Sequence, residues 1–245
     1  MKTTYLALEA KRALRNPRFL LFTMVFPVVI FLIDVAAFGK GDVPGSHTAY
    51  AAYLMVSMAA WGGFMAAMNT GARTAVERAA GWQRQLRLTP LRPTGYLIAK
   101  GAVGLFVALP PIVIVALVGM FAENVHLSAS SWAQVVLGVW IATIPFAVLG
   151  LLVGQIATSE TMQVFTSGLM IVLGFLGGIL IPITVFPTWM ASIAKVLPSY
   201  WLADIGHAAL LGNTDTGRAI IWLAGWTVVL GFGVVRRYQR DSARV

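Results

Sequence analysis

Charged side chains able to bind a partner or a lipid headgroup gather in one stretch, ERAAGWQRQLRLTPLRPTGYLIAK at positions 77–100. The windows on either side, 43–72 and 101–122, contain no Asp, Glu, Lys or Arg. On a helical wheel, one face carries Arg73, Glu77, Arg84 and Arg87, and the opposite face carries Ala75, Ala79, Trp82 and Leu86. An amphipathic cytoplasmic helix is predicted over 73–92, ending at Thr89-Pro90 because proline disfavours helix in the residue before it. Such a helix suits either anionic lipid headgroups or a docking partner.

Residues for enzymatic chemistry are scarce elsewhere in the chain. No phosphate-binding loop of the form G-x-x-x-x-G-K-[ST] is present, so any ATP hydrolysis would have to come from a separate polypeptide. The chain has no cysteine, and His47, His126 and His207 fall in predicted outer loops without metal-ligand spacing. With no histidine inside a predicted span, a Ser-His pair of the intramembrane protease kind is not expected. We therefore expect no catalytic residue, no metal site and no cofactor bound by this chain.

The composition identifies the class of protein. Of the 245 residues, 58% are hydrophobic and only 11% are charged, and the mean hydropathy is +0.80. So few charges cannot cover a water-soluble surface, which usually needs about a quarter of the residues to be charged. We predict an all-α polytopic membrane protein with a single transmembrane domain over 1–245. Its six expected spans cover about 19–38, 49–70, 98–121, 132–157, 162–185 and 219–235.

The positions of the basic residues set the orientation. In the six-span arrangement, 15 of the 18 Lys and Arg residues fall on one side, which the positive-inside rule places in the cytoplasm. Both termini are therefore expected inside, with an interfacial helix over 1–18. Because topology accounts for these charges, no nucleic-acid partner is expected, and the lipid bilayer is the expected surroundings.

Two further features lie toward the outer side. Asp34 is an acid within the first apolar span, and its place near the outer edge favours an interfacial position over a cargo or proton site. Between the fifth and sixth spans, Pro182, Pro187 and Pro198 interrupt an apolar region. We expect short amphipathic helices over 182–213 that dip into the outer interface and return. Passive surface helices anchored by tryptophans are the alternative.

The chain resembles the permease subunits of type-2 ABC exporters over nearly its whole length. Arg15-Asn16-Pro17 matches the end of their N-terminal interfacial helix. Their loop between spans two and three reads E-R-E-x-G-T-x-x-x-L-x-x-T-P-L, matched here at Glu77, Arg78, Gly81, Leu86, Thr89, Pro90 and Leu91. Ala79 replaces the second acid and Trp82 replaces the threonine.

Later motifs extend the resemblance. The family pattern S-G-x-x-x-P, then P-x-W, then L-P-x-x-Y is matched by Gly178 and Pro182, by Pro187 and Trp189, and by Pro198 and Tyr200. Where the family often has an arginine about seven residues after that tyrosine, His207 stands instead.

The resemblance implies a division of roles among these residues. Coupling to an ATP-binding cassette subunit, which would hold ATP and Mg, is assigned to Arg73, Glu77, Arg78, Gly81, Arg84, Leu86, Thr89 and Pro90. An outer gate is assigned to Gly178, Pro182, Pro187, Trp189, Pro198 and Tyr200. A second permease copy, a cell-membrane location and a small hydrophobic cargo (a drug, as in antibiotic resistance, a natural product or a lipid) complete the expectation. An importer-type or energy-coupling subunit, and a non-transporting intramembrane enzyme or sensor, remain the alternatives.

Overall fold

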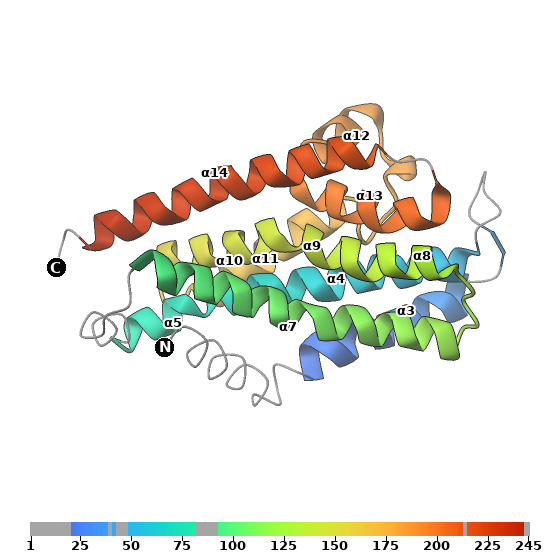
Figure 1. The fold of residues 1–245 in the computed structure, drawn as a ribbon, viewed down its shortest axis with the longest axis horizontal. Helices are drawn as coiled ribbons and strands as arrows, with labels where there is room; N and C mark the ends of the chain where they lie inside the picture. Colours follow the sequence, from blue (N-terminus) through green and yellow to red (C-terminus); the bar gives the residue numbers. More distant parts are fainter. Residues whose placement is uncertain (1–20, 39–40, 43–48, 82–92, 213–214, 243–245) are drawn as a thin grey trace.

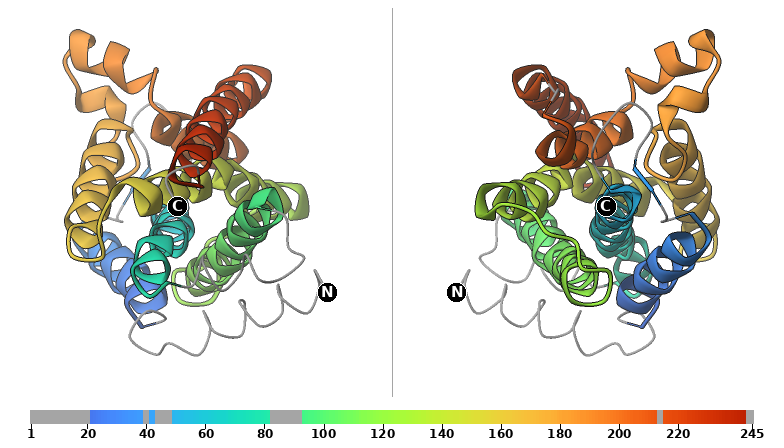
Figure 2. Two further views of the ribbon diagram at one scale, coloured as in Figure 1. Left: turned by 90° about the vertical axis from the view of Figure 1, so that its left-hand side faces the viewer. Right: turned by 90° about the vertical axis from the view of Figure 1, so that its right-hand side faces the viewer.

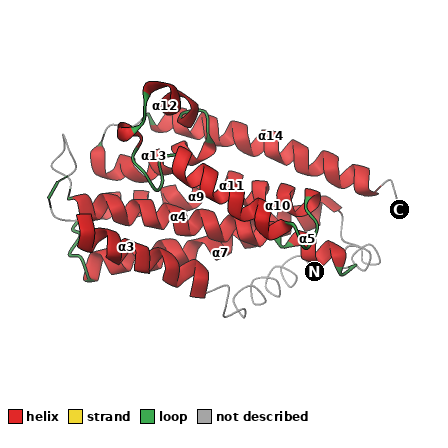
Figure 3. Cartoon of the chain, turned by 180° about the vertical axis from the view of Figure 1, so that it is seen from behind, coloured by secondary structure: helices red, strands yellow, loops and turns green. Residues whose placement is uncertain are grey.

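The part of the chain that the computed structural model describes is helical. It covers residues 21–38, 41–42, 49–81, 93–212 and 215–242, and within these ranges one isolated bridge, Asp42 with Ala49, is the nearest thing to a strand (Figures 1 and 3). The all-α prediction is confirmed. The expected interfacial helix over 1–18 lies outside the described residues.

Thirteen helical elements and turns concern the argument below, and several join end to end. In chain order they are the π-helical turn η1 (Leu21–Val25), α3 (Phe26–Phe38), α4 (Tyr50–Ala72), α5 (Thr74–Ala79), α7 (Pro93–Phe121), α8 (Ala129–Ala133), the π-helical turn η2 (Gln134–Gly138), α9 (Val139–Ala142), α10 (Ile144–Ile156), α11 (Met162–Leu176), α12 (Thr188–Ala194), α13 (Pro198–Leu211) and α14 (Thr216–Ser242). A short 3₁₀ turn, η3 (Ile183–Val185), precedes α12.

Among the described residues, five helices are long and apolar enough to cross a membrane, judged by length and composition. They cover Leu21–Phe38, Tyr50–Ala79, Gly95–Phe121, Ala129–Ile156 and Thr216–Arg240. Each arises where the sequence carries a long apolar run, because about 20 such residues span the hydrocarbon core as a helix. Five of the six expected spans thus have counterparts in the structure.

The remaining expected span, 162–185, is wrong in its length. The helix α11 stops at Leu176 and has 15 residues, which is about 22 Å at 1.5 Å per residue. The chain turns at Gly178, whose φ of +78° is readily adopted only by glycine, and the amide of Ile179 donates back to Gly174 O at 3.2 Å. Backbone geometry therefore ends α11 before the first proline is reached.

Helix α4 is the centre of the bundle. In its most apolar 18-residue window 83% of the residues are buried, against 22% in the windows of Leu21–Phe38 and Thr216–Arg240. Viewed from the end, α3, α7, α10 and α11 surround α4, while α14 lies at the periphery (Figure 2). The aromatic core follows from this arrangement, because Phe64 on α4 contacts Trp61 one turn away and Phe146 on α10 edge to face.

Candidate functional site

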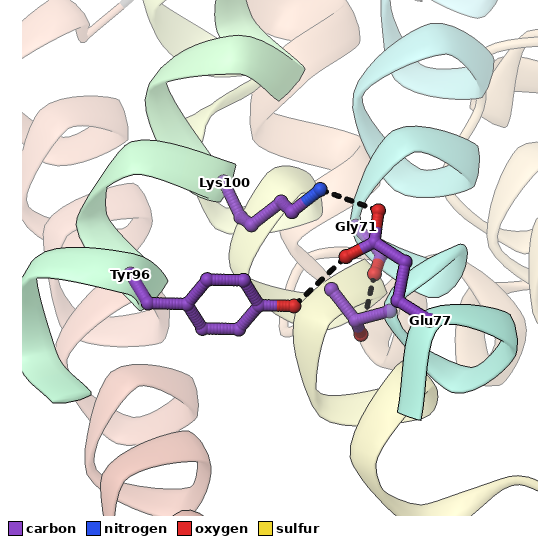
Figure 4. A network of polar contacts seen from close by, with 5 residues as sticks. Gly71, Glu77, Tyr96 and Lys100 are labelled. Carbon is purple, nitrogen blue, oxygen red and sulfur yellow. Dashed lines mark hydrogen bonds and ion pairs between the residues drawn. The ribbon is translucent and has the colours of Figure 1, made fainter. Parts of the chain in front are cut away.

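A buried ionic network lies where α4 passes into α5. Lys100 Nζ donates to Glu77 Oε1 at 2.5 Å, and Tyr96 Oη donates to Glu77 Oε2 at 2.9 Å (Figure 4). The Lys100 side chain is 4% exposed and that of Glu77 is 11% exposed. Two charges removed from water to this degree are stable only as a pair, so the network joins α5 firmly to α7.

Local sequence explains why these groups meet. Tyr96 and Lys100 lie one helical turn apart on α7, so both side chains project from the same face. On the other side, the chain bends at Arg73 between α4 and α5, and Thr74 Oγ1 donates to Gly71 O at 2.9 Å across the bend. The bend turns the first turn of α5, which carries Glu77, toward α7.

Arg78 ties the same short helix to α10. Its guanidinium donates to Gln155 O, and its second terminal nitrogen donates to Ala157 O at 2.6 Å. These carbonyls lie at the C-terminal end of α10, which ends at Ile156. A helix leaves its last carbonyls without intrahelical partners and carries a partial negative charge there, so an arginine stabilises that end.

A close crossing of α4 and α10 sets the distance between these anchors. A Cβ at Gly71 would lie 2.5 Å from Leu151 N, and a Cβ at Gly150 would lie 2.2 Å from Met68 O. A Cβ at Gly154 would lie 2.0 Å from Thr74 Oγ1. The two backbones touch only because these residues have no side chain.

The coupling residues expected from the sequence divide into two groups. Arg73 lies at the bend, and Glu77 and Arg78 point into the bundle, as described above. Gly81 has a φ of +72°, and no atom of the described residues would lie within 4 Å of a Cβ added there. The others, Arg84, Leu86, Thr89 and Pro90, lie outside the described residues.

The predicted helix over 73–92 differs from the structure in its extent. Helix α5 ends at Ala79, and the left-handed backbone of Gly81 prevents regular α-helix from running on through that residue. Its faces also differ from the wheel, since Ala75 is buried whereas Ala79 is exposed. A wheel assumes that one continuous helix lies on a flat interface, and here bundle packing determines which face is covered.

The outer-gate residues lie on four successive pieces of chain after α11. Gly178 forms the turn described above, Pro182 precedes η3 and Pro187 precedes α12. Trp189 on α12 is exposed. On α13, Pro198 is the first residue and Tyr200 packs edge to face on Trp201. Short helices were predicted in this region, and short helices are found.

Helix α13 is more deeply buried than an interfacial helix should be. Trp201, which the alternative of passive surface helices would use as an anchor, is buried and stacks on Trp222 of α14 with ring centroids 6.1 Å apart. Most of the inward residues of α13 are buried, among them Leu202, Ile205 and His207.

His207 corrects an expectation from the sequence. It was placed in an outer loop, yet it lies in the core on α13, where Nε2 is 3.1 Å from Ser57 Oγ on α4. Its ring also stacks on Tyr53, with centroids 3.9 Å apart, and Nε2 lies 3.3 Å from Tyr53 O. A serine and a histidine therefore do meet at one depth. Both residues are buried, and their contact joins α13 to α4.

Lys100, Gly150 and Gly154 were not among the residues predicted to form this site, for identifiable reasons. Lys100 was counted only as a cytoplasmic charge, although its spacing from Tyr96 marks a polar face on an apolar helix. The glycine pair Gly150 and Gly154 forms a G-x-x-x-G pattern within an apolar span, a signal of close helix packing, and it was not used.

Comparisons with known proteins agree on one family. Residues 33–236 match the family described as "ABC-2 family transporter protein". The chain is also 29% identical over 233 residues to "Putative transport permease YvfS" of Bacillus subtilis (strain 168), and the match covers 95% of this chain and 94% of the relative.

Proposed function

The chain belongs to the ABC-2 family of transporter proteins, and from this premise we propose that it is the membrane-spanning permease of a bacterial ABC exporter. A separate ATP-binding cassette subunit supplies the energy by hydrolysing Mg-bound ATP. The observation that carries the proposal is the double attachment of α5, to α7 through Glu77 and to α10 through Arg78. A short helix fastened to several spans can convert a partner's movement into a rearrangement of those spans.

The distribution of basic residues supports a cytoplasmic position for this end of the bundle. The last turns of α14, with Arg236, Arg237 and Arg240, lie at the same end as α5 (Figure 1). An excess of arginine at one end of a helical membrane protein favours the cytoplasmic side of the plasma membrane. Both termini are then inside, and the region from Gly178 to Tyr200 faces outward as the outer gate.

The character of the spans supports a hydrophobic cargo. Large apolar side chains cover the exposed faces of the spans, and Asp34 and Lys100 lie near the ends of the apolar helices α3 and α7. A path built between such helices, completed by a second copy of the permease, suits a drug, a natural product or a lipid better than a charged solute.

Purification from native membranes tests the proposal. The tagged chain, extracted under mild conditions, should carry a second polypeptide with a phosphate-binding loop and should hydrolyse ATP in a Mg-dependent manner. Substituting the loop lysine of that polypeptide should abolish the hydrolysis. Cells overproducing both should accumulate less ethidium than cells carrying the lysine variant. Purification without any ATPase would refute the proposal, and ATP-dependent uptake in place of efflux would indicate an importer.

A further inference from the structure

We infer that Glu77 and Lys100 form an internal strut that transmits movement of α5 into α7, so Glu77 acts within the permease and not as a contact for a basic group on the ATP-binding subunit. The inference rests on the proposed function for the source of the movement. Glu77 and Lys100 are positioning residues, since neither is assigned to bind cargo or nucleotide.

The geometry leaves Glu77 poorly placed for an outside partner. Both carboxylate oxygens already accept hydrogen bonds, one from Lys100 and one from Tyr96. The ammonium group comes from a side chain that is 4% exposed. A basic residue arriving from outside would have to compete with this ammonium group for the carboxylate and break an ion pair between two mostly buried side chains, which is costly.

The residues next to Glu77 also differ in whether they contact the bundle or are exposed. Arg78 is engaged at the end of α10, whereas Val76, Ala79 and Ala80 are exposed. Glu77 and Arg78 therefore contact the bundle, while Val76 and Ala79 are exposed and Ala75 is buried.

The long helix α7 can carry the movement. It has 29 residues, or about 43 Å at 1.5 Å per residue, and Lys100 lies near its beginning. A displacement of α5 applied at Lys100 therefore acts near the start of one helix, which contains Pro110 and Pro111 and runs the length of the bundle past α4 (Figure 1).

The first test uses the purified permease alone, in nanodiscs of phosphatidylethanolamine and phosphatidylglycerol. Glu77→Gln and Lys100→Met should each lower the melting temperature by about 5–10 °C, because each removes an ion pair between two mostly buried side chains. The double variant should melt closer to the unmodified chain than either single variant. Glu160→Gln, the same change at an exposed carboxylate near the end of α10, should leave the melting temperature unchanged. Additive effects of the two substitutions would overturn the inference.

The second test separates transmission from stability. A single cysteine at Ser192 on α12, toward the other end of the bundle, takes an environment-sensitive fluorophore, and the chain has no native cysteine to interfere. With saturating ATP-binding subunit, ATP should change the fluorescence of the otherwise unmodified chain. In the Glu77→Gln, Lys100→Met double variant that change should fall at least about tenfold, while the Kd for the subunit changes less than about threefold.

The outcomes distinguish this inference from the proposed function. A normal fluorescence change in the double variant, or a tenfold loss of subunit binding by Glu77→Gln in a chain of unchanged melting temperature, would overturn the strut. Failure of any ATP-binding subunit to bind the unmodified chain would overturn the proposed function instead, and the partner-free melting experiment would still decide whether the pair exists.

Discussion

Adding one methyl group at Gly150 should separate the two helices that hold α5 in place. A Cβ there would lie 2.2 Å from Met68 O and 2.9 Å from Met68 C, both backbone atoms of α4. Ordinary contact begins near 3.4 Å, so the backbones of α4 and α10 must move apart by about 1 Å. Overpacking of this kind costs about 1–3 kcal/mol, while alanine itself favours a helix by about 0.5–1 kcal/mol over glycine.

The net effect is a measurable loss of stability. We expect Gly150→Ala to lower the free energy of unfolding by about 1–2 kcal/mol, which corresponds to a melting temperature lower by about 2–8 °C for a chain of this size. Thermal unfolding of the purified chain in nanodiscs, followed by circular dichroism, measures the shift.

Matched controls come from α14. A Cβ at Gly225 or at Gly231 would meet no atom of the described residues within 4 Å, so alanine at either position should leave the melting temperature unchanged or raise it slightly. If Gly150→Ala behaves like these two controls, the close crossing of α4 and α10 does not exist as described, and the reasoning about the anchors of α5 loses its basis.

Three further outcomes are expected. In intact cells a membrane-impermeant thiol reagent should label cysteines introduced at Ser130 and Ser192 but not at Glu160, and labelling of the last position alone would invert the proposed orientation. Gly178→Ala forces a side chain into a left-handed turn and within 2.7 Å of a neighbouring isoleucine, so it should destabilise the chain by about 1–3 kcal/mol in thermal unfolding, and a neutral result would contradict the turn. Ser57→Ala removes the hydroxyl that meets the histidine of α13 and should cost about 1 kcal/mol in the same assay, where an unchanged melting temperature would show that the contact contributes nothing.

The sequence by itself determined the class of the protein and most of its spans. Windows free of charge and about 20 residues long can be read as spanning helices because the thickness of the bilayer sets that length. The family was also within reach, because its motifs at Glu77, Gly81, Pro182 and Tyr200 depend on order and spacing along the chain. The early end of α11 was not anticipated, since an unusual φ at a glycine leaves no pattern of hydrophobicity.

Only the tertiary structure decided what the motif residues touch. Glu77 and Lys100 are 23 positions apart, and Ser57 and His207 are 150 positions apart. Whether such residues meet depends on which faces of packed helices are turned toward each other and on how closely the backbones approach. At this protein's centre the backbones of α4 and α10 come close at Gly71 and Gly150, where an added Cβ would lie 2.5 Å and 2.2 Å from a backbone atom of the facing helix. Packing decides whether a charged side chain pairs with a lipid, with a partner protein or with a neighbouring residue. When packing buries the charge beside an internal partner, loss of that partner costs stability, so the internal pair is kept.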